Sequence, residues 1–369
     1  MKRPALLLAL LLAAALPTAC VQPRLDGPDH GADGPPWIAQ DLAGTVAPFE
    51  VEQRIVLIGD AGLYLEDDPV LASLRTWTAD VPSTVVFLGD NLYDEGLQPD
   101  DRDRGEKILR QQVEATDALR VFVPGNHDWG LSPNGQDPAV VGNQQAYLEG
   151  FEGVRFAPAQ GCMGPAELVL PGRAAGRAVV LVLADPTKWI YPALETRCAR
   201  TETHDGFLAE LDGLLTRHAD DWVVMGSHYP METGGPHGGL SYGRIGDMVL
   251  AFYAWRYGGL GNTYEPDYAD WIARTTEVMR RHPPTLYAAG HDHSLQILDG
   301  HGYARMEVVS GAGAVDRVST VTDLPASKFA HAAPGFVLLD LGLRDGEPVG
   351  ALRVVEGSAT APVFEIGID

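Results

Sequence analysis

The sequence is poor in cysteine, poor in basic residues and without an apolar run long enough to cross a bilayer. Cysteine occurs only three times in 369 residues, as Cys20, Cys162 and Cys198. The leucine- and alanine-rich run over residues 5–16 has twelve residues, whereas a transmembrane helix needs about 20. The length of this run therefore excludes a transmembrane anchor at this position.

Positive charge is also scarce. Lys and Arg number 27 against 50 Asp and Glu, for a formal net charge of -23. Such a surface repels nucleic-acid backbones and anionic lipids at long range, so we expect no nucleic-acid partner and no membrane binding through a basic patch. A small phosphorylated substrate would need a local positive charge, which bound metal ions can supply.

The first feature that is present is an export signal. The basic start Met1-Lys2-Arg3, the run 5–16 and the small residues before Cys20 predict a signal peptide over residues 1–19. The segment resembles a bacterial lipoprotein signal, in which the cysteine becomes the lipidated first residue, although Pro17 stands where an aliphatic residue is usual. We expect an exported protein anchored by lipid at Cys20 in the bacterial outer membrane or periplasm. Ordinary cleavage with secretion is the alternative.

The mature chain is predicted to be one catalytic domain, residues 53–369, behind a linker. Residues 20–52 are rich in proline, glycine and aspartate without sustained periodicity, which is typical of a flexible linker. Because an exported protein meets an oxidising compartment, we expect a disulfide between Cys162 and Cys198, with two unpaired thiols as the alternative. We expect a monomer.

Apolar strands and amphipathic helices alternate along this domain. Strands are expected at 54–58, 84–88 and 120–123, with helices at 69–79 and 106–119. This order predicts a parallel sheet with helices on its faces. Later strands are expected at 178–184, 222–226 and 285–289, and later helices at 142–147, 207–218 and 269–281. Short alternating strands after residue 295 predict an antiparallel second sheet.

Five strands end in polar side chains that can bind a metal ion. Each fragment alone is also compatible with an ordinary turn. Together they offer two carboxylates, one phenol oxygen, one amide oxygen and three imidazoles, which is more than one ion needs. A shared Asp90 would give each of two ions four protein ligands. The side chains are Asp60, Asp90 with Tyr93, Asn126, His228, and His291 with His293.

These side chains lie in motifs that resemble those of the purple acid phosphatases, a group within the calcineurin-like metallophosphoesterase superfamily. The likeness extends from about residue 54 to about residue 340 and is greatest to the small, tartrate-resistant type. It implies an α/β fold of two mixed β-sheets packed face to face with helices outside, a four-layer αββα sandwich. The motifs are Gly59-Asp60-Ala61-Gly62, Gly89-Asp90-Asn91-Leu92-Tyr93, Gly125-Asn126-His127-Asp128, Ser227-His228-Tyr229-Pro230 and Gly290-His291-Asp292-His293.

The resemblance also implies ligands for a dinuclear centre. Fe(III) would be held by Asp60, Tyr93 and His293. A divalent ion, Fe, Zn or Mn, would be held by Asn126, His228 and His291, with Asp90 as the bridge. Tyr93 distinguishes this group from most of the superfamily, which has an aspartate there and a histidine where this chain has Gly62.

The implied activity is hydrolysis of phosphate monoesters, as in an acid phosphatase. Two ions would clamp the phosphate oxygens and lower the pKa of a bound water. His127 would stabilise the transferred group or protonate the leaving oxygen, and His237 would contact the substrate. The alternatives are a supporting role for His127 without substrate contact and a solvated loop position for His237. Asp185, which also follows a strand, is interpreted as a turn residue, with an edge position near the site as the alternative.

Two other functions are compatible with the sequence. A phosphodiesterase or nucleotide pyrophosphatase would use the same centre, and a non-catalytic surface protein would keep the fold as a binding module. The presence of all seven expected ligands favours an enzyme. The connection 231–266, rich in glycine and aromatic residues, is either a lid or substrate-selecting wall, or an ordinary surface excursion.

Overall fold

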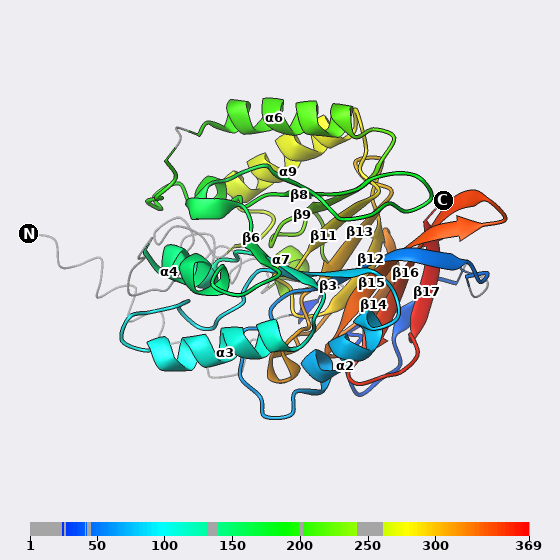
Figure 1. Cartoon of the computed structure of the whole chain (residues 1–369), viewed down its shortest axis with the longest axis horizontal. Helices are drawn as coiled ribbons and strands as arrows, with labels where there is room; N and C mark the ends of the chain where they lie inside the picture. The colour runs from blue at the N-terminus through cyan, green and yellow to red at the C-terminus, as the bar shows by residue number, and fades with distance from the viewer. Residues whose placement is uncertain are drawn as a thin grey trace, which may run out of the picture.

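Two β-sheets form the centre of the molecule, and helices lie on their outer sides, as Figure 1 shows for the computed structural model of the chain. The structure describes residues 24–25, 27–40, 42, 46–130, 139–199, 202–241 and 261–368. The predicted signal peptide 1–19, the predicted anchor residue Cys20 and residues 242–260 of the long connection lie outside the described residues. Within the described ranges, no helix combines the length and the apolar character that a membrane span requires.

The first sheet has seven strands in the order β17-β16-β15-β3-β4-β5-β6. Strands β3 to β6 are parallel neighbours, and β15, β16 and β17 extend the β3 edge as an antiparallel meander. Both faces of β3 are apolar, with Ile55 and Leu57 in the core between the sheets and Val56 and Ile58 against the helices. The strands are β3 (Glu50–Ile58), β4 (Ser83–Leu88), β5 (Leu119–Val123), β6 (Val154–Phe156), β15 (Gly335–Arg344), β16 (Glu347–Glu356) and β17 (Phe364–Ile368).

The second sheet has eight strands in the order β2-β14-β12-β13-β11-β9-β8-β7. Its centre is parallel, from β8 through β9 and β11 to β13, and its two edges are antiparallel. The strands are β2 (Trp37–Ile38), β7 (Ala166–Val169), β8 (Val179–Leu183), β9 (Trp222–Gly226), β11 (Leu286–Ala289), β12 (Leu295–Asp299), β13 (Met306–Ser310) and β14 (Ser327–His331). A separate pair joins β1 (Arg24–Leu25) to β10 (Leu240–Ser241).

Helices bury the outer face of each sheet, with α6 and α9 on one side of the molecule and α2 and α3 on the other (Figure 1). Local sequence explains where they start. In α2, the Asp68 carboxylate accepts hydrogen bonds from the amides of Val70 and Leu71, and Pro69 occupies the first turn, where its missing N–H costs nothing. The predicted four-layer α/β sandwich is confirmed. The helices are α2 (Pro69–Thr78), α3 (Arg102–Glu114), α4 (Ala139–Leu148), α5 (Thr187–Ile190), α6 (His204–Arg217), α7 (Pro236–Gly239) and α9 (Pro266–Met279).

The strands after residue 295 pair mostly antiparallel, as predicted, but the prediction that they form one second sheet is wrong. Strands β12, β13 and β14 complete the second sheet, and β13 runs parallel to β11. The last three strands, β15 to β17, belong to the first sheet. Alternation of apolar and polar residues indicates that a segment has a face to bury, but it does not indicate which strand is its neighbour.

Part of the segment predicted as a flexible linker is packed on the domain. Strand β2 pairs with β14. His30 exchanges backbone hydrogen bonds with Val321 and Ala332, and its ring nitrogen Nε2 lies 2.7 Å from the Asp323 carboxylate. Strand β3 also begins inside the predicted linker, at Glu50. Residues 27–40 therefore belong to the folded domain rather than to a free tether.

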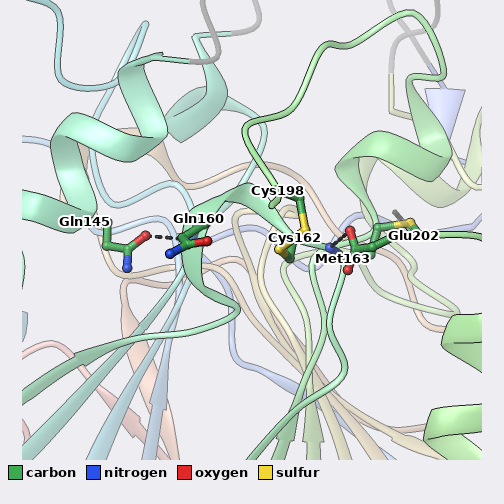
Figure 2. The surroundings of a disulfide bond; sticks show 6 residues. All are labelled: Gln145, Gln160, Cys162, Met163, Cys198 and Glu202. Carbon is green, nitrogen blue, oxygen red and sulfur yellow. Dashed lines mark hydrogen bonds between the residues drawn. A yellow bond between two sulfur atoms is a disulfide. The ribbon is translucent and has the colours of Figure 1, made fainter. Parts of the chain in front are cut away.

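A disulfide joins Cys162 to Cys198, which lie 36 residues apart in the sequence (Figure 2). Cys162 lies in the connection that leaves β6 of the first sheet for β7 of the second, and Cys198 follows α5. Beside the bridge, the Met163 amide donates a hydrogen bond of 2.7 Å to the Glu202 carboxylate. The predicted disulfide is confirmed, and it ties the connection between the sheets to the loop after α5.

Candidate metal centre

The five predicted polar clusters lie at the carboxyl ends of strands β3, β4, β5, β9 and β11. The first three strands are parallel neighbours in the first sheet, and the last two are parallel neighbours in the second. Hydrogen bonds join the loops at these ends, from the Asp60 amide to the Gly89 carbonyl at 2.9 Å and from the Gly290 amide to the His228 carbonyl at 3.0 Å. Ligand sites in open α/β sheets occur at this edge.

One group of contacts unites Asp60, Tyr93 and His293. The Tyr93 hydroxyl donates a hydrogen bond of 2.8 Å to Oδ1 of Asp60, and it lies 3.2 Å from Nε2 of His293. Nε2 of His293 is 3.3 Å from the same Asp60 oxygen. Asp60 and Tyr93 are fully buried. Three donors of different chemistry therefore meet at one point.

A second group of contacts unites Asn126, His228 and His291. Nε2 of His228 lies 3.1 Å from Oδ1 of Asn126 and 3.1 Å from Nδ1 of His291. The same nitrogen is 3.4 Å from Oδ2 of Asp90. Donor atoms of Asp60, Asp90 and His228 lie within 4.8 Å of one another, which makes these three residues a possible metal site. Asp90 thus lies between the two groups.

Backbone carbonyls fix the orientation of all three imidazoles. Nδ1 of His228 lies 2.9 Å from the Leu88 carbonyl, Nε2 of His291 lies 2.8 Å from that of Gly261, and Nδ1 of His293 lies 2.7 Å from that of Arg317. Because a carbonyl only accepts, each of these nitrogens carries the hydrogen, and the other nitrogen of each ring presents its lone pair to the site. This is the arrangement of metal-binding histidines.

The contact between His228 and His291 needs a positive charge. Their inward nitrogens face each other at 3.1 Å, and two lone pairs at that distance repel unless a proton or a metal ion lies beside them. Burial disfavours the imidazolium of His228, but the nearby Asp90 carboxylate outweighs it and raises the pKa of His228 to about 10. Burial and the charges of His237 and His228 lower the pKa of His291 well below its ordinary value. A metal ion can replace the proton that this pocket favours, so the residues fit the implied ions.

Two more pKa shifts, at Asp90 and Tyr93, reflect the same electrostatic environment. Burial opposes ionisation of Asp90, yet the charges of His228 and His127 hold the pKa of this carboxyl well below its usual range. The pKa of the Tyr93 phenol is raised well above its ordinary value. Burial is the largest cause, and the charges of Asp60 and Asp90 follow. Arg317 opposes that rise.

Backbone strain marks three of the seven positions. Asp60, Asp90 and His291 have φ values of 60°, 51° and 71°, in the left-handed region that favours glycine. Strained conformations of this kind cost about 1–3 kcal/mol each and cluster at functional sites. Their side chains are buried and point into one site, which explains why glycine does not occupy these positions.

The packing around Gly62 explains why this chain lacks the histidine that the resemblance leads one to expect in most of the superfamily at this position. A Cβ atom at this position would lie 2.6 Å from the carbonyl oxygen of Asp90 and 2.7 Å from the amide nitrogen of Leu92. The backbone of the Asp90 loop occupies the space that a side chain would need. A histidine here would require a different backbone path.

The two predicted catalytic histidines flank the site. The ring of His127 packs edge-on against Tyr93, its side chain is 25% exposed, and its Nε2 lies 3.9 Å from Oδ2 of Asp90. Its Nδ1 donates a hydrogen bond to the Asp94 carbonyl, so Nε2 is the ring nitrogen that faces Asp90. His237, in α7, lies against His291 with ring centroids 3.9 Å apart, and its Nδ1 is buried without a hydrogen-bond partner in the described part of the chain. His237 is therefore at the site and not on a solvated loop.

Sequence reasoning missed two carboxylates that hold the loops. Asp128 is fully buried and accepts hydrogen bonds from the amides of Gly125, Asn91 and Leu92, and from the side-chain amide of Asn91. Asp292 accepts hydrogen bonds from the Thr233 hydroxyl at 2.6 Å and the His237 amide at 3.1 Å. Both lie inside the quoted motifs, Asp128 two residues after Asn126 and Asp292 between His291 and His293, and this position was the available signal.

Two further residues were outside the predicted site. Arg317 lies over Tyr93, and no motif pointed to it. Asp185 is buried and accepts hydrogen bonds from the Thr187 hydroxyl and the Trp129 ring nitrogen, in agreement with its interpretation as a turn residue.

Comparison with known families decides the family. The profile described as calcineurin-like phosphoesterase matches residues 53–295. The chain belongs to the calcineurin-like phosphoesterase family. Members of this family typically bind a dinuclear metal centre, and the strand ends of this phosphoesterase provide the possible site at Asp60, Asp90 and His228. No curated protein matches the chain.

Solved structures are also similar to this phosphoesterase, and the first of those given below agrees with the fold. The structure described as GAP50, the anchor in the inner membrane complex of Plasmodium, is 14% identical, with coverage of 87% of this chain and 89% of that chain and a TM-score of 0.54. Vacuolar protein sorting 29 from Cryptosporidium parvum is 12% identical over 83% of this chain and 100% of that chain, with a TM-score of 0.29. Vps29 from Entamoeba histolytica, complexed with zinc, is 13% identical over 86% and 99% of the two chains, with a TM-score of 0.28.

Proposed function

We propose that this phosphoesterase is an exported acid phosphatase of the purple type, which hydrolyses small phosphate monoesters with a centre of Fe(III) and a divalent ion. The observation that carries this proposal is the buried Tyr93 hydroxyl, between Asp60 and His293. A phenol oxygen beside a carboxylate is a hard donor set suited to Fe(III). The amide and imidazole donors of Asn126, His228 and His291 suit Fe(II), Zn(II) or Mn(II).

The chain's own residues divide the work of the reaction. When bound, the two ions would polarise the phosphate oxygens and lower the pKa of a water molecule. Asp90, between the two donor groups, would hold both ions at once. His127 donates from Nδ1 to the Asp94 carbonyl and faces the Asp90 carboxylate through Nε2, and in its protonated form it can donate a proton from this nitrogen to the leaving oxygen. His237 extends the wall of the site over His291.

Elemental analysis with a visible spectrum tests the metal assignment. The purified protein is expected to contain two metal ions per chain, one of them iron, and to absorb visible light because of Tyr93. Tyr93→Phe keeps the ring and removes only the oxygen, so it should lose the band, whereas Tyr64→Phe on the exposed surface should keep it. A metal-loaded protein that is colourless in both oxidation states would contradict the ferric assignment.

The substrate class has a separate test. We expect faster hydrolysis of a nitrophenyl phosphate monoester than of the matching diester, with an acidic optimum. A preference for the diester would instead indicate the phosphodiesterase or pyrophosphatase alternative. Two bound metal ions without turnover of either ester would indicate a binding protein.

We further propose that Cys20 carries the lipid and is the chain's only membrane contact. The disulfide between Cys162 and Cys198 supports an oxidising compartment. Cys20→Ala is expected to move the protein from the membrane fraction to the soluble exported fraction. Membrane retention of this variant would contradict the anchor.

A further inference from the structure

Arg317 contacts two of the three residues proposed to hold Fe(III). It is the last residue of η3 (Val315–Arg317), in the loop after β13. Its backbone carbonyl accepts the hydrogen bond from Nδ1 of His293 at 2.7 Å. Its guanidinium carbon lies 3.8 Å from the centroid of the Tyr93 ring. The main chain of this residue therefore orients an imidazole, while its side chain places a permanent positive charge on a phenol ring.

The surroundings of the guanidinium preserve the effect of that charge. One side faces Asp94, with Nη1 at 2.9 Å from the carboxylate, and the side chains of Arg317 and Asp94 are 30% and 75% exposed. Water therefore screens the Asp94 charge strongly. The other side lies on the Tyr93 ring, which is fully buried. A charge acts more strongly through such a low-dielectric region than through water.

We propose that Arg317 tunes the electronic properties of the ferric site by stabilising the filled ring orbitals of Tyr93. The inference rests on the proposed ferric function. Visible charge transfer moves one electron from the phenolate ring to the iron and so removes negative charge from the ring, which a guanidinium at this distance opposes. Arg317 therefore moves the band to higher energy. The same positive charge favours the added electron of Fe(II) over Fe(III), so it raises the reduction potential.

The test uses the full-length iron-loaded protein and two neutral variants. Arg317→Met removes the charge, and Arg317→Gln removes it while keeping a donor for Asp94. Both leave the backbone carbonyl that holds His293. We expect the absorption maximum to move to longer wavelength and the midpoint potential, from spectroelectrochemical titration, to fall in both variants. Arg317→Lys keeps the charge and should stay closer to the wild type.

Arg104 provides the matched control. Its Nη2 donates a hydrogen bond of 2.8 Å to the Tyr93 carbonyl, so it grips the main chain of the same tyrosine and not its ring. Arg104→Met removes one positive charge beside the same residue and should leave the maximum and potential unchanged.

The outcomes separate this inference from the function on which it rests. A colourless wild type would overturn the ferric centre and this inference with it. If the wild type is coloured and Arg317→Gln has the same absorption maximum and midpoint potential, only the role of Arg317 is overturned. Equal shifts in Arg104→Met and Arg317→Gln, or in Arg317→Lys and Arg317→Gln, would overturn it as well. Since Arg317→Gln keeps a hydrogen-bond donor on the side chain, it decides the question even if Arg317→Met does not fold.

Discussion

The two sheets contribute different chemistry to one site. All the oxygen donors follow strands of the first sheet, and all the imidazoles follow strands of the second. Each proposed ion takes donors from both sheets, and Asp90 lies between the two groups. The oxygen donors are Asp60, Asp90, Tyr93 and Asn126, and the imidazoles are those of His228, His291 and His293. The site is therefore a joint between the sheets, which neither sheet can build alone.

The sheets also differ in how they hold their loops. In the first, the buried Asp128 binds both the Asn91 loop and the Gly125 turn. In the second, Asp292 binds the segment from Thr233 to His237. Each of these two carboxylates thus holds loops of one sheet, whereas the distance between oxygen and nitrogen donors depends on how the sheets pack. Removing a ligand that both proposed ions share should therefore have larger effects than changing a residue that supports the loops of one sheet.

The largest expected effect comes from Asp90→Asn, which weakens the joint itself. One preorganised hydrogen-bond donor to a transition state is worth about 10²–10³ in turnover, and Asp90 would serve both ions. We expect a loss in kcat of more than about 1,000-fold, measured with a phosphate monoester. Asp117→Asn, a change of the same kind at a side chain that is 91% exposed, is the control. Near wild-type turnover of Asp90→Asn would exclude a bridging role.

Metal binding should also stabilise the joint. At a free concentration about 1,000 times its Kd, an ion that binds only the folded chain adds about 4 kcal/mol of stability. We expect chelation to lower the melting temperature, and metal addition to restore it together with protection of backbone amides at the ends of β3 and β9 in hydrogen exchange. His291→Ala should lose most of the metal-dependent shift. Equal melting temperatures with and without metal would contradict the centre.

A smaller effect is expected from disturbing one side at a time. Asp128→Asn replaces one carboxylate oxygen by an NH2 group, which would face the N–H group of either Gly125 or Leu92 and could not accept its hydrogen bond. Residues that support metal ligands typically contribute 10- to 100-fold to metal affinity, and we expect a loss of about this size in a competition titration. Asp292→Asn should weaken metal affinity less and raise KM more, because Asp292 holds His237. The reverse order would show that the second sheet fixes the centre.

The smallest effect is the pH dependence of the stabilisation by His218, which is not one of the proposed metal ligands. His218 has its Nδ1 2.9 Å from Asp221 and its Nε2 2.7 Å from Glu167. Burial lowers the pKa of His218, but these carboxylates outweigh it, so the folded pKa is raised. The stabilisation is therefore fully present below the unfolded pKa and is lost as pH rises through the raised folded value. In the first sheet, by contrast, Asp340 pairs with Arg54, which keeps its charge over this range.

Urea unfolding at about pH 5.5 and about pH 9 measures this contrast, since the ordinary histidine pKa lies between these values. The wild type should exceed His218→Gln in free energy of unfolding by about 1 kcal/mol or less at the lower pH, and by less still at the higher pH. Comparison of the two proteins cancels the contribution of all other histidines. A difference that grows with pH would contradict the sign.

Local sequence patterns located most elements but not all of their ends. Helix α3 was predicted at 106–119 and spans Arg102–Glu114. It ends early because the Thr116 hydroxyl bonds the Ala118 amide and the Thr78 hydroxyl, contacts that periodicity does not reveal. The short strand β2 was missed because two residues carry no periodic signal, and its pairing with β14 depends on segments almost 300 residues apart.

The sequence by itself determined which donors follow which strands, because apolar runs and the polar residues that end them are local features. It therefore predicted the seven clustered side chains, whereas the four layers of the fold were implied by the family resemblance and the cysteine pair by the expected oxidising compartment. Only the tertiary structure decided that oxygen and nitrogen donors come from different sheets and which ring nitrogens face the site. The guanidinium of Arg317 over Tyr93 was decided in the same way. These features depend on contacts between distant segments, such as Asp60 and His291, which are 231 residues apart. Hydrophobic packing of the two sheets creates these contacts, and no local pattern encodes them.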